Sequence, residues 1–200
     1  MLELRDITFG YKTEKPLYQG ISLYVEPGER VALVAPSGFG KTTLCSIAAG
    51  YLRPIAGEVL VDGEPLPKTG KSPVQMIWQH PERVLDPRMR MRDSLTEAGC
   101  IDEQLLADVG IRPEWLSRFP HELSGGELQR FCIARALMAK PRYLVADEIS
   151  TMLDALTQAQ LWRFLLEQAQ NRELGMIVVS HSEALLEHVA TRVLDLRDLT

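Results

Sequence analysis

Short apolar runs separated by turn residues dominate the pattern of this chain. Val31 to Val34 are four apolar residues in a row, as is typical of a strand buried on both faces of a sheet. Leu2 to Tyr11 alternate moderately and end in Gly-Tyr, which predicts a strand and a turn, and a polar loop is expected at 12–16. The pattern predicts strands at 2–11, 17–25, 31–34, 57–61, 74–78, 143–146, 176–180 and 193–196.

Helical spacing replaces this pattern in the middle of the chain. Residues 82–140 carry apolar residues at helical intervals and no convincing strand, which indicates a helical insertion between two strands of an α/β core. Ser94 and Glu97 have the spacing of a capping box, and Arg53-Pro54 should stop the first helix. Helices are predicted from 41 to about 51, and at 102–110, 124–137, 155–170 and 182–190.

Composition places the chain among ordinary globular proteins. Its 200 residues, 46% apolar and 24% charged, are enough to bury a substantial core in one domain. No run approaches about 18 apolar residues and the first residues are charged, so we expect neither a membrane span nor a secreted protein. The net charge of −5, without a Lys/Arg run, argues against nucleic acid as the main partner. Cys45, Cys100 and Cys132 lack metal-ligand spacing, which predicts reduced thiols in a cytosolic protein.

The segment between the third predicted strand and the first predicted helix carries the clearest chemistry. A glycine-rich loop in this position points its backbone N–H groups inward, and the helix N-terminus adds partial positive charge. Lys41 can reach the β and γ phosphates of a nucleotide, and Thr42 can offer its hydroxyl to Mg²⁺. The phosphate site is therefore assigned to Ser37, Gly38, Phe39, Gly40, Lys41, Thr42 and Thr43.

Ala35 stands where the phosphate-loop pattern G-x-x-x-x-G-K-[ST] has its first glycine. If this position needs φ > 0, alanine is strained by about 1 kcal/mol or more. If φ is negative, alanine costs nothing and stiffens the loop. We favour the second alternative because everything after Ala35 is intact.

Polar residues follow three of the predicted buried strands. Asp147 and Glu148 follow one of them, as an acidic pair that suits Mg²⁺ coordination and activation of water. Gln79 and His181 follow two others, at the edge where ligands sit in open α/β sheets. A polar residue at a strand end more often lies at the surface than binds a ligand. Considered by itself, Gln79 follows this general rule. His181 is the third polar position presented at this edge, which favours a functional site.

A later helix start and an early aromatic residue add to this chemistry. Ser124 and Glu127 have the spacing of an N-cap and its partner. Gly125 and Gly126 cost about 1 kcal/mol each relative to alanine, so capping alone does not explain them. They leave the backbone N–H groups and the helix dipole open to an anion. Tyr11 is either a half-buried packing residue or a flat face on which a base stacks.

Together these residues resemble the ATP-binding subunits of ABC transporters over nearly the whole chain. The string LSGGELQR at 123–130 matches the family signature, which other P-loop classes lack. YLVADE at 143–148 matches Walker B with its catalytic glutamate, although Ile149-Ser150 replaces the usual Pro-Thr. The other matches are Tyr11 with the adenine-stacking aromatic, Pro36 to Thr43 with Walker A, Gln79 with the Q-loop, Leu153-Asp154 with the D-loop and His181 with the switch histidine.

The resemblance implies a fold, cofactors and catalytic roles. The fold would be an α/β P-loop NTPase core with a mixed, mainly parallel sheet, an N-terminal antiparallel β subdomain and an inserted α-helical subdomain. ATP and Mg²⁺ are the implied cofactors. Glu148 would polarise the attacking water, and His181 would contact the γ-phosphate. The implied metal ligands are Thr42, Gln79 and Asp147.

Domain organisation and assembly follow from the same resemblance. Residues 1–200 would form a single ABC ATPase domain, with about 1–80 and 141–200 as the nucleotide-binding core and about 81–140 as the helical insertion. Two such chains would associate head to tail and sandwich two ATP molecules. The implied contacts to the ATP of the partner chain are Ser124, Gly125 and Gly126.

The implied partners are membrane permease subunits and a second nucleotide-binding subunit, either another copy or a paralogue. A substrate-binding protein is added if the system is an importer. The chain would be cytoplasmic and peripheral at the inner face of the cell membrane. PHELSGG and the run PERVLDPR after Gln79 resemble the peptide/nickel import group. One alternative is a soluble ABC-type ATPase of a cytosolic complex without a permease. Another is a degenerate module, against which the intact Lys41, Glu148 and His181 argue.

Overall fold

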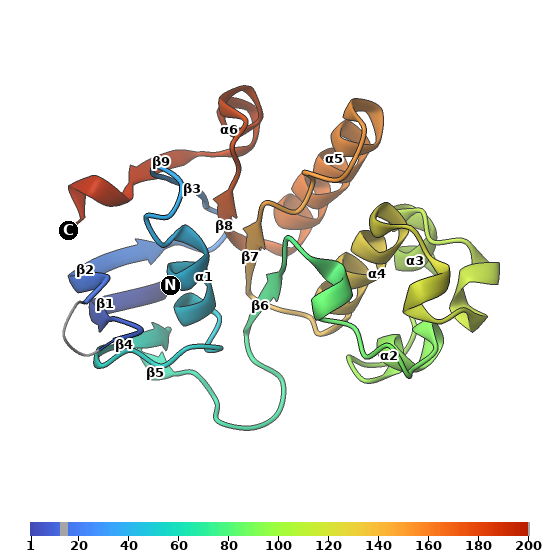
Figure 1. Ribbon diagram of the computed structural model, residues 1–200, viewed down its shortest axis with the longest axis horizontal. Coiled ribbons are helices and arrows are strands. Elements are labelled where there is room, and N and C mark those ends of the chain that lie inside the picture. The colour runs from blue at the N-terminus through green and yellow to red at the C-terminus, as the bar shows by residue number, and fades with distance from the viewer. Residues whose placement is uncertain (13–15, 200) are drawn as a thin grey trace.

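The computed structural model describes residues 1–12 and 16–199 and contains two β-sheets (Figure 1). The larger sheet has the strand order β6-β7-β8-β3-β9, and its neighbouring strands pair in parallel. The carboxyl ends of these strands therefore meet at one edge. The strands are β3 (Arg30–Val34), β6 (Val74–Ile77), β7 (Tyr143–Asp147), β8 (Gly175–Val179) and β9 (Arg192–Asp195).

The smaller sheet is antiparallel and has the order β2-β1-β4-β5. Its strands are β1 (Leu2–Phe9), β2 (Tyr18–Val25), β4 (Ala56–Val61) and β5 (Glu64–Pro65). The predicted α/β class is confirmed, with the antiparallel strands in a sheet of their own rather than at the flank of a mixed one. Each predicted strand is present. Of the polar loop predicted at 12–16, residues 13–15 lie outside the described residues.

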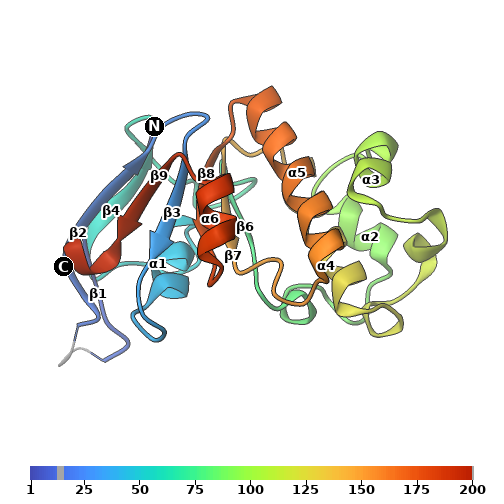
Figure 2. The ribbon, with the colours of Figure 1, turned by 90° about the horizontal axis from the view of Figure 1, so that it is seen from above.

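Helical elements fill the chain between β6 and β7 and gather at one end of the molecule (Figures 1 and 2). They are α2 (Met91–Thr96), α3 (Glu103–Val109), α4 (Gly125–Met138) and the short 3₁₀ helices Pro81–Arg83, Pro113–Ser117 and Pro120–Glu122. The other helices are α1 (Lys41–Ala48), α5 (Ala155–Arg172), α6 (Glu183–Val189) and the short Leu196–Asp198. No helix in the described part of the chain is long and apolar enough to cross a membrane.

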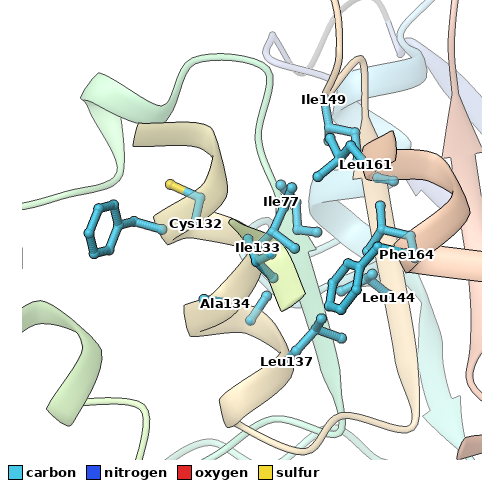
Figure 3. Packing of buried hydrophobic residues seen from close by; sticks show 14 of the residues in the cluster. Ile77, Cys132, Ile133, Ala134, Leu137, Leu144, Ile149, Leu161 and Phe164 are labelled. Atoms are coloured by element: carbon cyan, nitrogen blue, oxygen red, sulfur yellow. The ribbon is translucent and has the colours of Figure 1, made fainter. Parts of the chain in front are cut away.

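The parallel strands divide the buried side chains between two clusters, because successive residues point to opposite faces of the sheet. Leu144 and Ala146 of β7 belong to the cluster that α4 and α5 cover, shown around Leu144 in Figure 3. Tyr143 and Val145 belong to the cluster shared with α1 and the antiparallel sheet. Burying such a side chain contributes about 1.5–3 kcal/mol relative to leaving it exposed. β7 therefore holds the two layers together.

Two predicted helix boundaries are wrong. α2 begins at Met91, and Ser94 lies buried inside the helix instead of capping it. Met91 is fully buried, and α2 contacts α4, so packing sets the start of α2. α1 ends at Ala48, before Arg53-Pro54, because Gly50 takes the left-handed conformation with φ of 81° that commonly ends a helix.

Candidate functional site

Glu148 lies in the middle of the edge formed by the strand ends. Its Oε2 accepts a hydrogen bond from Nε2 of Gln79 at 2.8 Å. Its other carboxylate oxygen, Oε1, lies 2.8 Å from Nε2 of His181. Gln79 comes after β6 and His181 after β8, so the parallel order β6-β7-β8 brings the three side chains together. Both oxygens of one carboxylate are thus engaged by residues from the two neighbouring strands.

The backbone of Glu148 is also unusual. Its φ of 51° lies in the left-handed region, which costs a non-glycine residue about 1–2 kcal/mol. Its N–H donates to the carbonyl of Val179 at 3.0 Å, so the pairing with β8 holds the residue in this conformation. Strained residues of this kind persist only where the surroundings over-determine them, and they cluster at active sites. Asp6, Asp62, Lys140 and Glu173 share this conformation, so the backbone marks Glu148 as a functional candidate only together with its place at the strand ends.

Lys41 folds back over the phosphate loop that connects β3 to α1. Its Nζ donates to the carbonyls of Ala35, at 2.7 Å, and Pro36, at 3.3 Å. The side chain is largely buried, and neutral carbonyls leave its charge available to an anionic ligand. Ala35 is not among the described residues with positive φ, so alanine is unstrained there, as the sequence favoured.

Gly40 is a loop residue for which glycine is required. Its φ of 98° suits glycine, and a Cβ at this position would lie 2.2 Å from the hydroxyl oxygen of Tyr18. The Tyr18 hydroxyl donates to the carbonyl of Gly40 and ties β2 to the start of α1. Sequence reasoning missed Tyr18 in this role, because its partner is 22 residues away and no local pattern connects them.

Asp147 is the buried carboxyl of the site. Burial raises its pKa above the usual value, and a hydrogen bond from Thr42 opposes the shift. Among the described residues, its Oδ1 has no hydrogen-bond partner. Thr42, Gln79 and Asp147 line one cavity of about 540 Å³. One carboxylate with hydroxyl and amide oxygens suits Mg²⁺, which keeps several waters and shares its shell with substrate phosphates.

Tyr11 offers an open aromatic surface beside α1. It is 73% exposed, so its interpretation as a half-buried packing residue is wrong. Its hydroxyl lies 3.0 Å from Oγ1 of Thr43. Its ring meets Phe9 edge to face, with the ring centroids 5.2 Å apart. The ring is therefore held near the P-loop with most of its surface exposed, as base stacking requires.

The start of α4 has the predicted reciprocal cap. The Ser124 N–H donates to Oε2 of Glu127 at 2.7 Å, and Oγ of Ser124 accepts from the Glu127 N–H at 3.3 Å. The bond from the Ser124 N–H to the ionised carboxylate is the main cause that holds the pKa of Glu127 below its usual value. Gly126 also has a packing reason, since a Cβ there would lie 2.9 Å from the end of the Leu153 side chain.

α4 and the P-loop helix α1 pack on different faces of the parallel sheet. α1 contributes to the hydrophobic cluster on one face of the parallel sheet, and α4 contributes to the cluster on the other face. Both ribbon views accordingly show β6 and β7 between the two helices (Figures 1 and 2). The structure therefore gathers the P-loop, Gln79, Asp147, Glu148 and His181 at one edge, whereas α4, which begins after Ser124, packs on the sheet face opposite α1.

A strand–loop–helix phosphate cradle at the carboxyl edge of a parallel sheet defines a P-loop nucleoside triphosphatase. Residues 18–151 match the family model described as ABC transporter. The chain is 34% identical over 212 residues to the nickel import system ATP-binding protein NikE of Staphylococcus aureus, covering 99% of this chain and 87% of that protein. It is 32% identical over 222 residues to the di/tripeptide transport ATP-binding protein DppF of Pseudomonas aeruginosa, covering 97% and 69%.

Solved structures agree with these relatives. An ATP-binding subunit of an ABC transporter superposes with a TM-score of 0.86 at 26% identity, over 98% of this chain and 85% of the other. A dimeric ATP-binding cassette bound to ADP and Pi shares the fold, with a TM-score of 0.84 at 22% identity over 98% and 94%. The chain therefore belongs to the ABC transporter family, as an ATP-binding subunit with ATPase activity.

Replacing the buried carboxyl is expected to stabilise the chain in the absence of ligands. Because burial raises the folded-state pKa of Asp147, its ionised form costs stability above that pKa. The cost disappears below the pKa of the unfolded chain, where both states are protonated. Asp147→Asn should therefore melt at a higher temperature than the wild type at neutral pH, and the two melting temperatures should converge below about pH 4. A difference that does not change with pH would contradict this account.

Proposed function

We propose that Glu148 is the general base of this ATPase and that hydrolysis drives a membrane permease. The observation that carries the proposal is the Glu148 carboxylate, held between Gln79 and His181 beside the P-loop. There Glu148 polarises the attacking water, and His181 contacts the γ-phosphate. Tyr11 stacks on the base, and the phosphates are bound by Ser37, Gly38, Phe39, Gly40, Lys41, Thr42 and Thr43.

Mg²⁺ belongs to the same proposal. Thr42, Gln79 and Asp147 would hold the ion, which when bound neutralises charge on the phosphates. Oδ1 of Asp147 has no hydrogen-bond partner in the described part of the chain, which supports this role because a cation compensates for the cost of burying that carboxylate. Gln79 donates to Glu148 through Nε2, so its amide oxygen is the atom it would offer to the ion.

Two chains would form the complete catalytic unit. The separation of α4 from α1 supports this, since the anion-binding helix start at Ser124, Gly125 and Gly126 then serves the ATP of a partner chain. The partner is a second copy or a paralogue. Each chain would act as one ATPase domain, with a core of about 1–80 and 141–200 and a helical insertion of about 81–140.

A cavity of about 750 Å³ beside the edge strand β6 supports a permease as the membrane partner. Tyr51 lines it, Ile55 follows the lining residue Pro54 in the sequence, and the two side chains are 57% and 58% exposed. Exposed apolar side chains within a polar rim mark interaction sites. Tyr51 also lines the cavity that contains Thr42 and Asp147. A permease segment bound in the larger cavity would therefore contact a residue that borders the proposed nucleotide site.

The names of the relatives suggest which cargo is transported and where in the cell the chain acts. A nickel import subunit and a di/tripeptide transport subunit are both similar to this chain, so nickel or short peptides are the proposed cargo. A substrate-binding protein would then deliver it to the permease. The chain would work in the cytoplasm, at the inner face of the cell membrane. With a net charge of −5, nucleic acid is not an expected partner.

Glu148→Gln should bind ATP but lower the rate of hydrolysis by about 10²–10⁴-fold, because the amide does not accept the proton of the attacking water. ATP turnover and fluorescent-nucleotide binding measure the two properties separately. Lys41→Ala is the contrasting variant and should weaken ATP binding by about tenfold or more. Near-normal turnover in Glu148→Gln would refute the assignment of the base.

Ser124→Arg should abolish ATP-dependent dimerisation while ATP binding persists, because the bulky cation fills the helix start. Sedimentation of the variant in a Glu148→Gln background, where ATP is hydrolysed only slowly, measures this. Ser117→Arg places the same side chain on an exposed serine of the helical region and should still dimerise. A stable ATP-dependent dimer of Ser124→Arg would count against the two-chain site.

The tagged chain should co-purify from detergent-solubilised membranes with a multi-span membrane protein that mass spectrometry can identify. Tyr51→Asp with Ile55→Asp should lose that protein, because the charges oppose apolar contact. Val193→Asp changes a side chain that is 56% exposed on the opposite edge strand, β9, and should keep it. Recovery of soluble proteins alone would favour a cytosolic complex without a permease.

A further inference from the structure

Gln129 is a buried polar residue of α4 to which the proposed reaction assigns no role. It is 3% exposed, and its neighbours on the helix, Leu128 and Phe131, are buried and apolar. A buried amide is costly unless it is hydrogen-bonded. Nε2 of Gln129 donates to the main-chain carbonyl of Trp78 at 3.2 Å. The two residues are 51 positions apart, so no local pattern in the sequence points to this contact.

Trp78 is the residue at which the chain leaves the parallel sheet. The pairing of β6 with β7 ends at Ile77 and Ala146, so the Trp78 carbonyl lies beyond the ladder and receives its donor from α4. This carbonyl belongs to the planar peptide unit that also contains the main-chain nitrogen of Gln79. Holding the carbonyl therefore fixes the direction in which Gln79 departs from the strand.

Gln79 carries this constraint to the carboxylate of the site. Its Nε2 donates to Oε2 of Glu148 at 2.8 Å. Two side-chain hydrogen bonds and one peptide unit thus connect α4 with Glu148. Gln129 lies three residues after Gly126, within one turn of the helix start that is proposed to meet a partner's phosphate.

We propose that Gln129 is a positioning residue for ATP hydrolysis, which sets the orientation of Gln79 against Glu148 through the Trp78 carbonyl. The proposal rests on the proposed catalytic role of Glu148 and adds a physical route from the start of α4 to that carboxylate. A displacement of α4 moves Gln129 and changes its hydrogen bond to the Trp78 carbonyl. The geometry of the base thereby depends on the state of the helix start.

Gln129→Met tests the proposal, because methionine keeps the length of the side chain and removes the donor. We expect kcat for ATP hydrolysis to fall about tenfold, as the loss of one hydrogen bond allows, while KM for ATP stays within about twofold. Gln129→Glu, which faces the Trp78 carbonyl with an acceptor only, should lose at least as much. Unchanged kcat in both variants would overturn the proposal.

A double-mutant cycle separates this role from a purely structural one. In a Gln79→Met background, Gln129→Met should lower kcat less than about twofold further, because the route to Glu148 is already broken. The same loss in both backgrounds would overturn the route through Gln79. Arg172→Met is the control. It removes the hydrogen bond from the Arg172 side chain to the Leu137 carbonyl, far from Gln129 along α4, and should keep kcat within about twofold.

The failure of this inference is distinguishable from the failure of the proposed site. If Glu148→Gln abolishes turnover and Gln129→Met does not slow it, only the positioning role is refuted. If Glu148→Gln turns over normally, the catalytic assignment itself is refuted, and the positioning role is refuted with it.

Discussion

The parallel pairing of β7 between β6 and β8 is the constraint on which the rest of the structure depends. Tyr143 and Val145 face one hydrophobic cluster, while Leu144 and Ala146 face the other, so β7 has no position where a polar side chain is cheap to place. Chemistry is therefore confined to the strand ends. Because the strands run in the same direction, residues that follow different strands reach the same edge, although they are distant in the sequence.

Holding the site in place lowers the stability of the folded chain. Asp147 keeps a carboxyl in a position where burial raises its pKa, and Glu148 holds a left-handed backbone. Lys41 buries an ammonium against neutral carbonyls. Strain and unmet polar groups cost about 1–3 kcal/mol each, and the two clusters around the sheet offset them. A nucleotide that relieves these costs would stabilise the folded chain as it binds, so affinity and folding are linked.

The sequence predicted those features whose signals are local. Apolar runs located the strands, and the spacing around Lys41 located the phosphate loop, because each pattern is complete within a few residues. It failed where the deciding contact is distant. The start of α2 depends on packing against α4 rather than on the serine at 94, and the role of Tyr18 depends on Gly40 in another element. Hydrogen bonds such as that between Gln129 and Trp78 belong to the same class.

The close approach of the Leu153 side chain to Gly126 couples two segments of this protein. Any side chain added at 126 would push against the segment that follows β7, because the missing Cβ would lie 2.9 Å from Leu153. A mutation at one position would then disturb both the helix start and the turn beside Glu148. The obstructing atom is the end of a flexible leucine side chain, so Leu153 can move aside for a small residue at 126 without itself being replaced. Divergence at 126 is therefore tolerated by the fold and appears instead as a shift of the segment that follows Glu148.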